Sequence, residues 1–129
     1  FDQIAKIIEE TDGEFHVWSG NDADTFLLMC LGGYGVISVA SHIVGKQIKG
    51  MMQMFLDGSI EGAAAEHRRM LPIFKGLFVV ANPIPVKYAV NQAGFNVGKP
   101  RLPLDEPDEK TAEFLNDLLS KYEVDLPVK

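Results

Sequence analysis

The sequence predicts an α/β segment followed by an all-helical region, and two observations lead to this prediction. Two β-prone runs, at residues 14–18 and 35–40, flank one short apolar stretch that starts with good helix-capping residues. This is the order of a strand–helix–strand unit, whose two strands run parallel with a right-handed crossover. After residue 41 the apolar residues recur at helical spacing, apart from one extended stretch at 101–104.

A helix and a strand open the chain. Residues 2–11 place three isoleucines at helical spacing, with two glutamates on the other side, and Gly13 ends the helix. Residues 14–18 favour a β-strand because they include valine and two aromatic residues, and Ser19-Gly20 ends that strand.

The next helix and strand complete the unit. Asn21 or Asp22 is suited to cap a helix that runs to residue 31, and its apolar face is expected to comprise Phe26, Leu27, Cys30 and Leu31. On this face Cys30 would be an inert core thiol. Residues 35–40 are nearly all apolar and rich in β-branched side chains, which is typical of a strand buried on both faces of a parallel sheet.

Helices fill the rest of the chain. The first is expected over 41–56 and is broken by Asp57-Gly58-Ser59. Ser59 caps the second, which Pro72 should kink. A proline-rich turn launches the third over 86–93, and the last begins at Pro107. Two strands alone leave both sheet edges unpaired, so we expect a larger parallel sheet and, for the chain by itself, self-association through these edges.

Composition narrows the possible functions. The 129 residues are 47% hydrophobic with a net charge of −6, and the mean hydropathy of +0.04 is that of a globular protein. No apolar run is long enough to span a bilayer, and the acidic surplus argues against nucleic acid as a partner. A single cysteine excludes a disulfide within the chain and fits a cytoplasmic location. The three histidines lack the spacing of metal ligands, so no metal or other cofactor is expected.

Four motifs occur in order along the chain: Trp18–Asp22 (WSGND), Gly32–Ser41 (GGYGVISVAS), Asn82–Lys87 (NPIPVK) and Arg101–Leu104 (RLPL). Together they resemble the C-terminal part of the dihydrodipicolinate synthase family, which belongs to the N-acetylneuraminate lyase superfamily of pyruvate-dependent class I aldolases. The resemblance covers essentially the whole chain.

The resemblance implies a (β/α)8 TIM barrel followed by a helical domain. Residues 1–58 would form the C-terminal segment of the barrel and residues 59–129 the all-helical C-terminal domain. Because a barrel needs about 250 residues, we expect this chain to be a C-terminal fragment. The implied activity is the Schiff-base condensation of pyruvate with L-aspartate-4-semialdehyde, a step of lysine and diaminopimelate biosynthesis, in a homotetramer.

The catalytic group of the family is a lysine near the end of a barrel strand, which attacks pyruvate as a neutral amine in a desolvated pocket. None of the lysines here is expected to be catalytic, because they lie on predicted helices, in a loop or at the terminus. Lys87 stands in a strongly patterned motif but is expected to be structural. By the resemblance, the Schiff-base lysine and the proton relay lie upstream of Phe1, so the chain alone should be inactive.

Two residues correspond to substrate-contacting positions of the family. Ile37 would contact bound pyruvate through its backbone carbonyl, and Gly20 would be a position where a side chain would intrude on the substrate. From the residues alone, a core isoleucine is the favoured interpretation of Ile37, and Gly20 can equally be a plain strand-to-helix turn. Asn21 and Asp22 are expected to act as helix caps, and Ser38 as a satisfied hydroxyl on the buried strand.

Two alternatives stay open. A related aldolase that acts on N-acetylneuraminate or on a 2-keto-3-deoxy sugar acid shares the barrel and the Schiff-base chemistry. A non-catalytic helical module that binds a partner through the amphipathic helices after Gly58 belongs to a different functional class.

Overall fold

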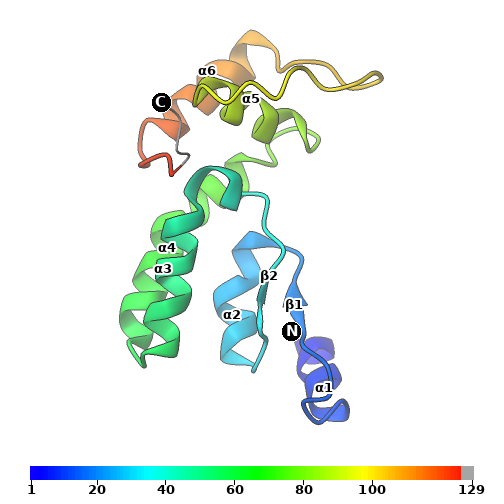
Figure 1. Cartoon of the computed structure of the whole chain (residues 1–129), viewed down its shortest axis with the longest axis vertical. Helices are drawn as coiled ribbons and strands as arrows, with labels where there is room; N and C mark the ends of the chain where they lie inside the picture. Colours follow the sequence, from blue (N-terminus) through cyan, green and yellow to red (C-terminus); the bar gives the residue numbers. More distant parts are fainter. Residues whose placement is uncertain (126–129) are drawn as a thin grey trace. The chain divides into compact units, whose positions relative to one another are not determined.

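The computed structural model describes residues 1–125, which divide into two units (Figure 1). Unit 1 comprises Phe1–Ser38 and Lys49–Arg69, and unit 2 comprises Val39–Ile48 and the chain from Met70 onward. The units therefore do not coincide with the expected division at residue 58, and that domain boundary stays a prediction. Among the described residues no helix is both long and apolar enough to cross a membrane.

The strand–helix–strand unit is present in unit 1. Strand β1 (Trp18–Ser19) pairs in parallel with β2 (Gly35–Val36), with Trp18 opposite Gly35 and Ser19 opposite Val36. The crossover contains the short 3-10 helix η1 (Asp22–Asp24) and helix α2 (Thr25–Cys30). Both strands are shorter than the runs that predicted them, and among the described residues they pair only with each other.

Two glycines allow the close packing around this unit. A Cβ atom on Gly33 would lie 1.7 Å from the side chain of Leu28, and one on Gly35 would lie 2.8 Å from the ring of Trp18. The Trp18 ring also contacts the Tyr34 ring, with their centroids 4.8 Å apart. Any side chain at either glycine would displace α2 or Trp18, so both positions need glycine for packing.

The buried face of α2 differs from the expected one. Thr25, Leu28 and Met29 are buried, whereas Leu27, Cys30 and Leu31 are exposed. The prediction that Cys30 is a core residue is therefore wrong. All of α2 except Thr25 is apolar or cysteine, so hydrophobicity alone could not select the face that packs. Helix α1 (Asp2–Glu10) has the expected amphipathic pattern but buries no residue.

Two long helices follow the sheet. Helix α3 (Ser41–Leu56) is followed by a turn at Gly58, whose φ of +82° favours glycine, and then by α4 (Ile60–Gly76). Pro72 lies within α4, which continues across it. The departure from helical geometry lies instead in α3 at Val44, with φ −125° and ψ 36°.

Unit 2 closes a helical core. Helix α5 (Ile84–Gln92) begins two residues earlier than expected, and α6 (Glu109–Leu119) is capped by the Asp108 carboxylate, which accepts a 2.8 Å hydrogen bond from Thr111 N. These helices pack together with parts of α3 and α4. The residues that they bury most deeply are apolar: Ile43, Val44, Met70, Ile73, Leu77 and Leu115.

Candidate functional site

The two predicted substrate-contacting residues lie side by side. Gly20 directly follows β1 and Ile37 directly follows β2, and Ile37 N donates a 2.8 Å hydrogen bond to Ser19 O. Because β1 and β2 are parallel, both residues lie at the carboxyl edge of the strand pair. In parallel α/β folds this edge carries the ligand site.

The exposure of Ile37 differs from that of a core residue. Ile37 is 70% exposed among the described residues, which leave its strand with one paired neighbour, so burial on both faces of a larger sheet stays a prediction. The carbonyl oxygen of Ile37 accepts no hydrogen bond from residues 1–125. Both observations leave the Ile37 backbone open to a molecule bound at the strand edge.

No contact or backbone conformation in the described part of the chain requires a glycine at position 20. A Cβ atom built there meets no atom within 4 Å in the described part of the chain, and the backbone of Gly20 is outside the left-handed region. Gly33 and Gly35 differ in this respect, because packing within the chain requires them. A requirement for glycine at position 20 would therefore come from outside the described residues, either from a bound molecule or from another part of the protein.

Hydrogen bonds of Ser19 fix the turn that carries Gly20. The Ser19 hydroxyl donates to Asn21 O at 2.7 Å, and Asn21 N donates back to Ser19 Oγ at 3.2 Å. Ser19 is buried, so this pair is protected from competing water. The backbone around Gly20 is consequently held in one conformation before any ligand binds.

A second polar pair joins the two strand ends. The Ser38 hydroxyl donates to Asp22 Oδ1, and the Asp22 side chain is only 2% exposed. Ser38 is thus a satisfied hydroxyl, as predicted. The prediction that Asp22 serves as a cap is wrong, since its carboxylate bonds across to the segment that follows β2.

Asn21 is the residue that caps the helical turn. Its Oδ1 accepts a hydrogen bond from Ala23 N at 3.2 Å, and its Nδ2 donates to Asp24 at 2.9 Å. This confirms the capping role of Asn21. The Asp22–Ser38 pair was missed from the sequence, although both residues follow a predicted strand by a few positions, which was the available signal.

The described lysines lie on helices, next to a helix end or in a loop, and none follows β1 or β2. Lys6, Lys99 and Lys121 form exposed ion pairs with nearby carboxylates. Lys87 projects from α5 and donates to Lys99 O at 2.7 Å, a contact within unit 2 that agrees with a structural role. Lys129 lies outside the described residues.

The histidines lie in three different environments. His16 stacks on Tyr34 with ring centroids 4.1 Å apart, His67 is buried beside Phe26 at 5.5 Å, and His42 is exposed. Burial lowers the pKa of His67, and the neighbouring Arg68 lowers it further, against the opposing effect of Asp24. Residues 1–125 contain no group of three or more histidine, cysteine or acidic side chains placed to hold a metal ion.

Comparison with protein families gives one decisive match. The model of the dihydrodipicolinate synthetase family matches residues 1–122. The chain belongs to this family. Relatives named 4-hydroxy-tetrahydrodipicolinate synthase include one from Dehalococcoides mccartyi, 56% identical over 128 residues, and one from Listeria welshimeri, 53% identical over 118 residues.

Solved structures of the same family confirm the fold class. Dihydrodipicolinate synthase from Aquifex aeolicus superposes with a TM-score of 0.90 at 37% identity, and the enzyme from Thermotoga maritima with 0.88 at 43% identity. The A. aeolicus match covers 99% of this chain and 43% of the A. aeolicus chain. The T. maritima match covers 93% of this chain and 42% of the T. maritima chain. The D. mccartyi and L. welshimeri matches cover 99% and 92% of this chain. This chain spans 43% and 40% of the lengths of these two relatives. It therefore represents the C-terminal part of the (β/α)8 family fold.

Membership of the dihydrodipicolinate synthetase family explains why the sheet has two strands with open edges. The barrel of the family is a closed parallel sheet, in which every strand has two neighbours. Among residues 1–125, β1 and β2 pair only with each other. The carboxyl edge that carries Gly20 and Ile37 is accordingly one arc of the rim on which TIM barrels build their active sites.

Proposed function

We propose that this chain is part of a 4-hydroxy-tetrahydrodipicolinate synthase, a lyase that condenses pyruvate with L-aspartate-4-semialdehyde through a Schiff base. The observation that carries this proposal is the 56% identity to a relative of that name over 128 residues. The geometry agrees with it, since Gly20 and Ile37 lie together at the carboxyl edge of two parallel strands.

In this proposal the chain contributes the wall of the pocket. The exposed carbonyl of Ile37 orients pyruvate, and the absence of a side chain at Gly20 leaves room for the substrate. The Ser19–Asn21 and Asp22–Ser38 hydrogen bonds hold both backbones in place. A rigid wall lowers the cost of binding, because the groups are already oriented when the substrate arrives.

The Schiff-base lysine, in this proposal, is contributed by sequence outside these 129 residues, so the isolated chain is inactive. Incubation of the chain with pyruvate and borohydride, followed by intact-mass measurement, should give no adduct. The complete protein should gain one pyruvate-derived group per subunit in the same experiment. A stoichiometric adduct on any lysine of this chain would show that the assignment of the nucleophile is wrong.

The substrate can be tested on the complete protein. A coupled assay should detect turnover with pyruvate and L-aspartate-4-semialdehyde. It should detect none with N-acetylneuraminate or with 2-keto-3-deoxy sugar acids. Cleavage of one of these sugar acids in preference to the condensation would instead identify a related aldolase.

The role of Gly20 has a matched control. Among the described residues, a Cβ built at Gly20 or at Gly50, which lies in α3, meets no atom within 4 Å beyond its own neighbours and helix backbone. In the complete enzyme Gly20→Ala should raise the KM for pyruvate or lower kcat by about tenfold or more, because it misplaces the substrate. Gly50→Ala should leave both constants unchanged. Equal kinetics for the two variants would remove Gly20 from the pocket.

We further propose that the complete enzyme acts as a cytoplasmic homotetramer, as the family resemblance implies. Sedimentation velocity of the complete protein should give a single species of four subunits. A monomer or dimer at all concentrations tested would contradict this part of the proposal.

A further inference from the structure

Unit 2 contains two adjoining hollows that share Pro83 and Lys87. The first has a volume of about 440 Å³ and is mainly apolar, with Val86, Val90 and Phe95 among its lining residues. The second has a volume of about 690 Å³ and is lined in part by Lys99 and Arg101. Cavities that bind small ligands typically measure roughly 300–1,000 Å³, so either hollow is large enough for one.

A polar scaffold holds the loop 97–101 against α5, next to these hollows. Asn91 accepts a hydrogen bond from Val97 N at 2.8 Å and donates to Gly98 O at 3.1 Å. One helical turn before Asn91, Lys87 Nζ donates a hydrogen bond to Lys99 O at 2.7 Å. Three side-chain contacts from two positions one helical turn apart therefore hold residues 97–99, next to both hollows, against α5.

The second hollow is lined by three basic residues in a chain whose net charge is −6: Lys87, which also lines the first hollow, Lys99 and Arg101. Lys87 uses one of its three donors on Lys99 O, which leaves two for another acceptor. The guanidinium of Arg101 forms no hydrogen bond or ion pair with the described residues. Lys99 is already paired with Glu106, so the cations available to a ligand are Lys87 and Arg101.

The two hollows thus differ in the chemistry that they can bind. The floor of the first is formed by Val86 and Val90, which are only 7% and 8% exposed, so it suits a hydrocarbon chain. The second offers an ammonium and a guanidinium, whose planar donor pair matches the geometry of a carboxylate. A ligand that fills both has an apolar tail and one anionic head.

We propose that unit 2 carries a binding site for an amphipathic monocarboxylate, with its hydrocarbon chain against Val86, Val90 and Phe95 and its carboxylate between Lys87 and Arg101. This inference is independent of the proposed catalytic activity. A purely inorganic anion would leave the apolar hollow unfilled, and a neutral hydrocarbon would leave both cations unpaired, so each should bind more weakly.

The test uses octanoate, 1-octanol and acetate as probes and the complete protein, because the 129-residue chain alone is expected to self-associate. Octanoate titrated into the ¹⁵N-labelled complete protein should shift the amide signals of Val86, Val90 and Val97 in a saturable manner. Octanol and acetate should each bind at least about tenfold more weakly, since each lacks one half of the interaction. This comparison needs no variant and does not depend on how a variant folds.

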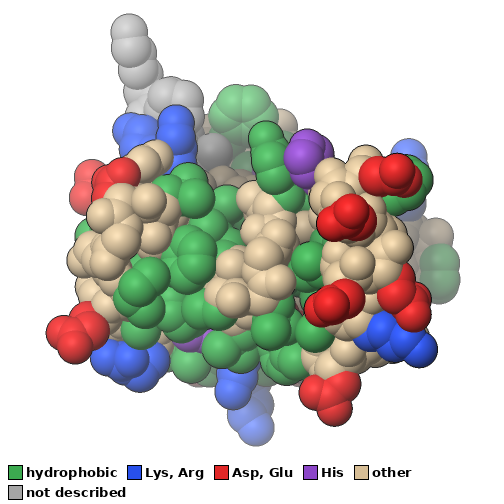
Figure 2. All heavy atoms as spheres, turned by 90° about the horizontal axis from the view of Figure 1, so that it is seen from below, with side chains coloured by type: hydrophobic (Ala, Val, Ile, Leu, Met, Phe, Trp, Pro, Cys, Tyr) green, Lys and Arg blue, Asp and Glu red, His purple; other side chains and the backbone are tan. Residues whose placement is uncertain are grey.

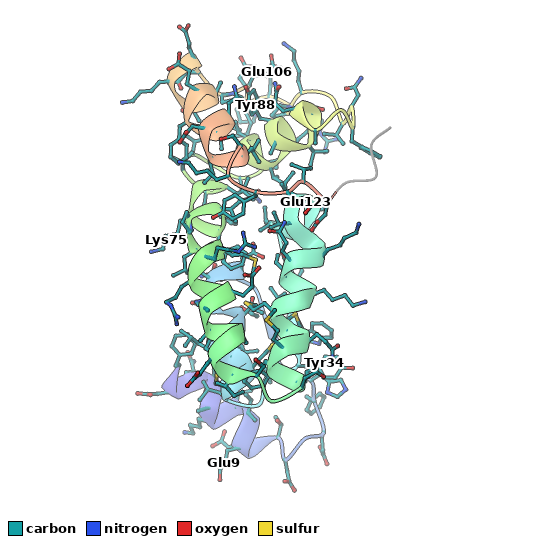
Figure 3. The ribbon with its side chains drawn as sticks, turned by 90° about the vertical axis from the view of Figure 1, so that its left-hand side faces the viewer. Glu9, Tyr34, Lys75, Tyr88, Glu106 and Glu123 are labelled. Atoms are coloured by element: carbon teal, nitrogen blue, oxygen red, sulfur yellow. The ribbon has the colours of Figure 1, made fainter. Side chains whose placement is uncertain are left out.

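Variants then test the cations. Lys87→Met and Arg101→Met should each weaken octanoate binding by about tenfold. Octanol binding should stay unchanged in Arg101→Met, because Arg101 lines only the second hollow and its side chain holds no other described residue in place. Lys75→Met is the matched control, since Lys75 projects from α4, lines neither hollow and carries the same charge (Figure 3). Circular dichroism confirms that each variant is folded.

Three results would overturn the proposal. The first is octanol binding as tightly as octanoate, which would mean that the cations contribute nothing. The second is equal weakening by Lys75→Met, which would mean a general charge effect. The third is a linear, non-saturating response of the Val86 and Val90 signals, which would mean that no defined site exists.

Discussion

The two units differ in how far they cover their own apolar side chains. In unit 2, Ile43, Met70 and Ile73 are completely buried. In unit 1, Ile37 is 70% and Trp18 46% exposed, and most of the large exposed hydrophobic residues of the described chain belong to this unit. Figure 2 shows hydrophobic side chains gathered across the middle of one face, with acidic side chains towards its edges.

The difference follows from the kind of secondary structure in each unit. A helix satisfies its backbone hydrogen bonds internally, so a few helices can bury a core with no other partner. A parallel strand needs a neighbour on each side and a covered face on both sides. Unit 1 therefore depends on further strands of the family barrel far more than unit 2 does.

The largest expected effect comes from replacing one isoleucine by alanine in each unit. Ile73→Ala should lower the free energy of unfolding by about 2–5 kcal/mol, because it opens a cavity in a fully buried position. Ile37→Ala should change it by less than about 0.5 kcal/mol, because the Ile37 side chain is mostly exposed. Urea unfolding followed by circular dichroism measures both. A loss at Ile37 that equals the loss at Ile73 would mean that the units do not differ.

The next effect concerns the polar contacts on which unit 1 relies. Ser38→Ala should destabilise the chain by about 1.5–3 kcal/mol, because it leaves the buried Asp22 carboxylate without this donor. Ser120→Ala is the control, since the Ser120 hydroxyl donates to Asp117 O at an exposed position. Urea midpoints of the two variants give the comparison. Similar midpoints would show that the Asp22–Ser38 pair does not hold the strand ends together.

Much of the fold could be predicted from the sequence. The order of elements, the parallel pairing of β1 with β2 and the ends of α3 and α5 follow from hydrophobic periodicity and from Gly58 and Gly94, both of which have positive φ. Gly20 and Ile37 could be placed together because the ends of parallel strands meet at one edge. Each of these features depends on residues within one helix or within the one strand–helix–strand unit.

The features that were missed depend on contacts between distant residues. The packed face of α2 could not be predicted, because Leu27 and Leu28 are equally hydrophobic and only the surrounding structure distinguishes them. The exposure of Cys30 has the same cause. The interruption of α3 at Val44 is accompanied by a hydrogen bond from Lys46 N to Asp125, about eighty residues further along the chain, and the residues around Val44 give no sign of this partner.

A moderate effect is expected at this interruption, within unit 2. Val44 breaks the helical ladder of α3, and the Asp125 carboxylate accepts hydrogen bonds from Lys46 N at 2.6 Å and Gln47 N at 3.4 Å, as an N-cap does. Asp125→Ala should therefore cost about 1 kcal/mol of stability. Asp117→Ala, which breaks an exposed ion pair with Lys121, should cost less than about 0.5 kcal/mol. Equal unfolding midpoints for these two variants would contradict the capping role of Asp125.

The smallest effect is a pH dependence that belongs to unit 1. The pKa of His67 is lowered from 6.5, first by burial and then by Arg68. Below pH 6.5 the unfolded chain therefore binds a proton that the folded chain does not, so the free energy of unfolding should fall as the pH is lowered from 6.5 to the folded-state pKa and then level off. His67→Met should remove this contribution to the slope, whereas His16→Gln, which retains His67, should keep it. Stability that rises on acidification through this range would mean that the folded state favours charged His67, and that Asp24 outweighs burial.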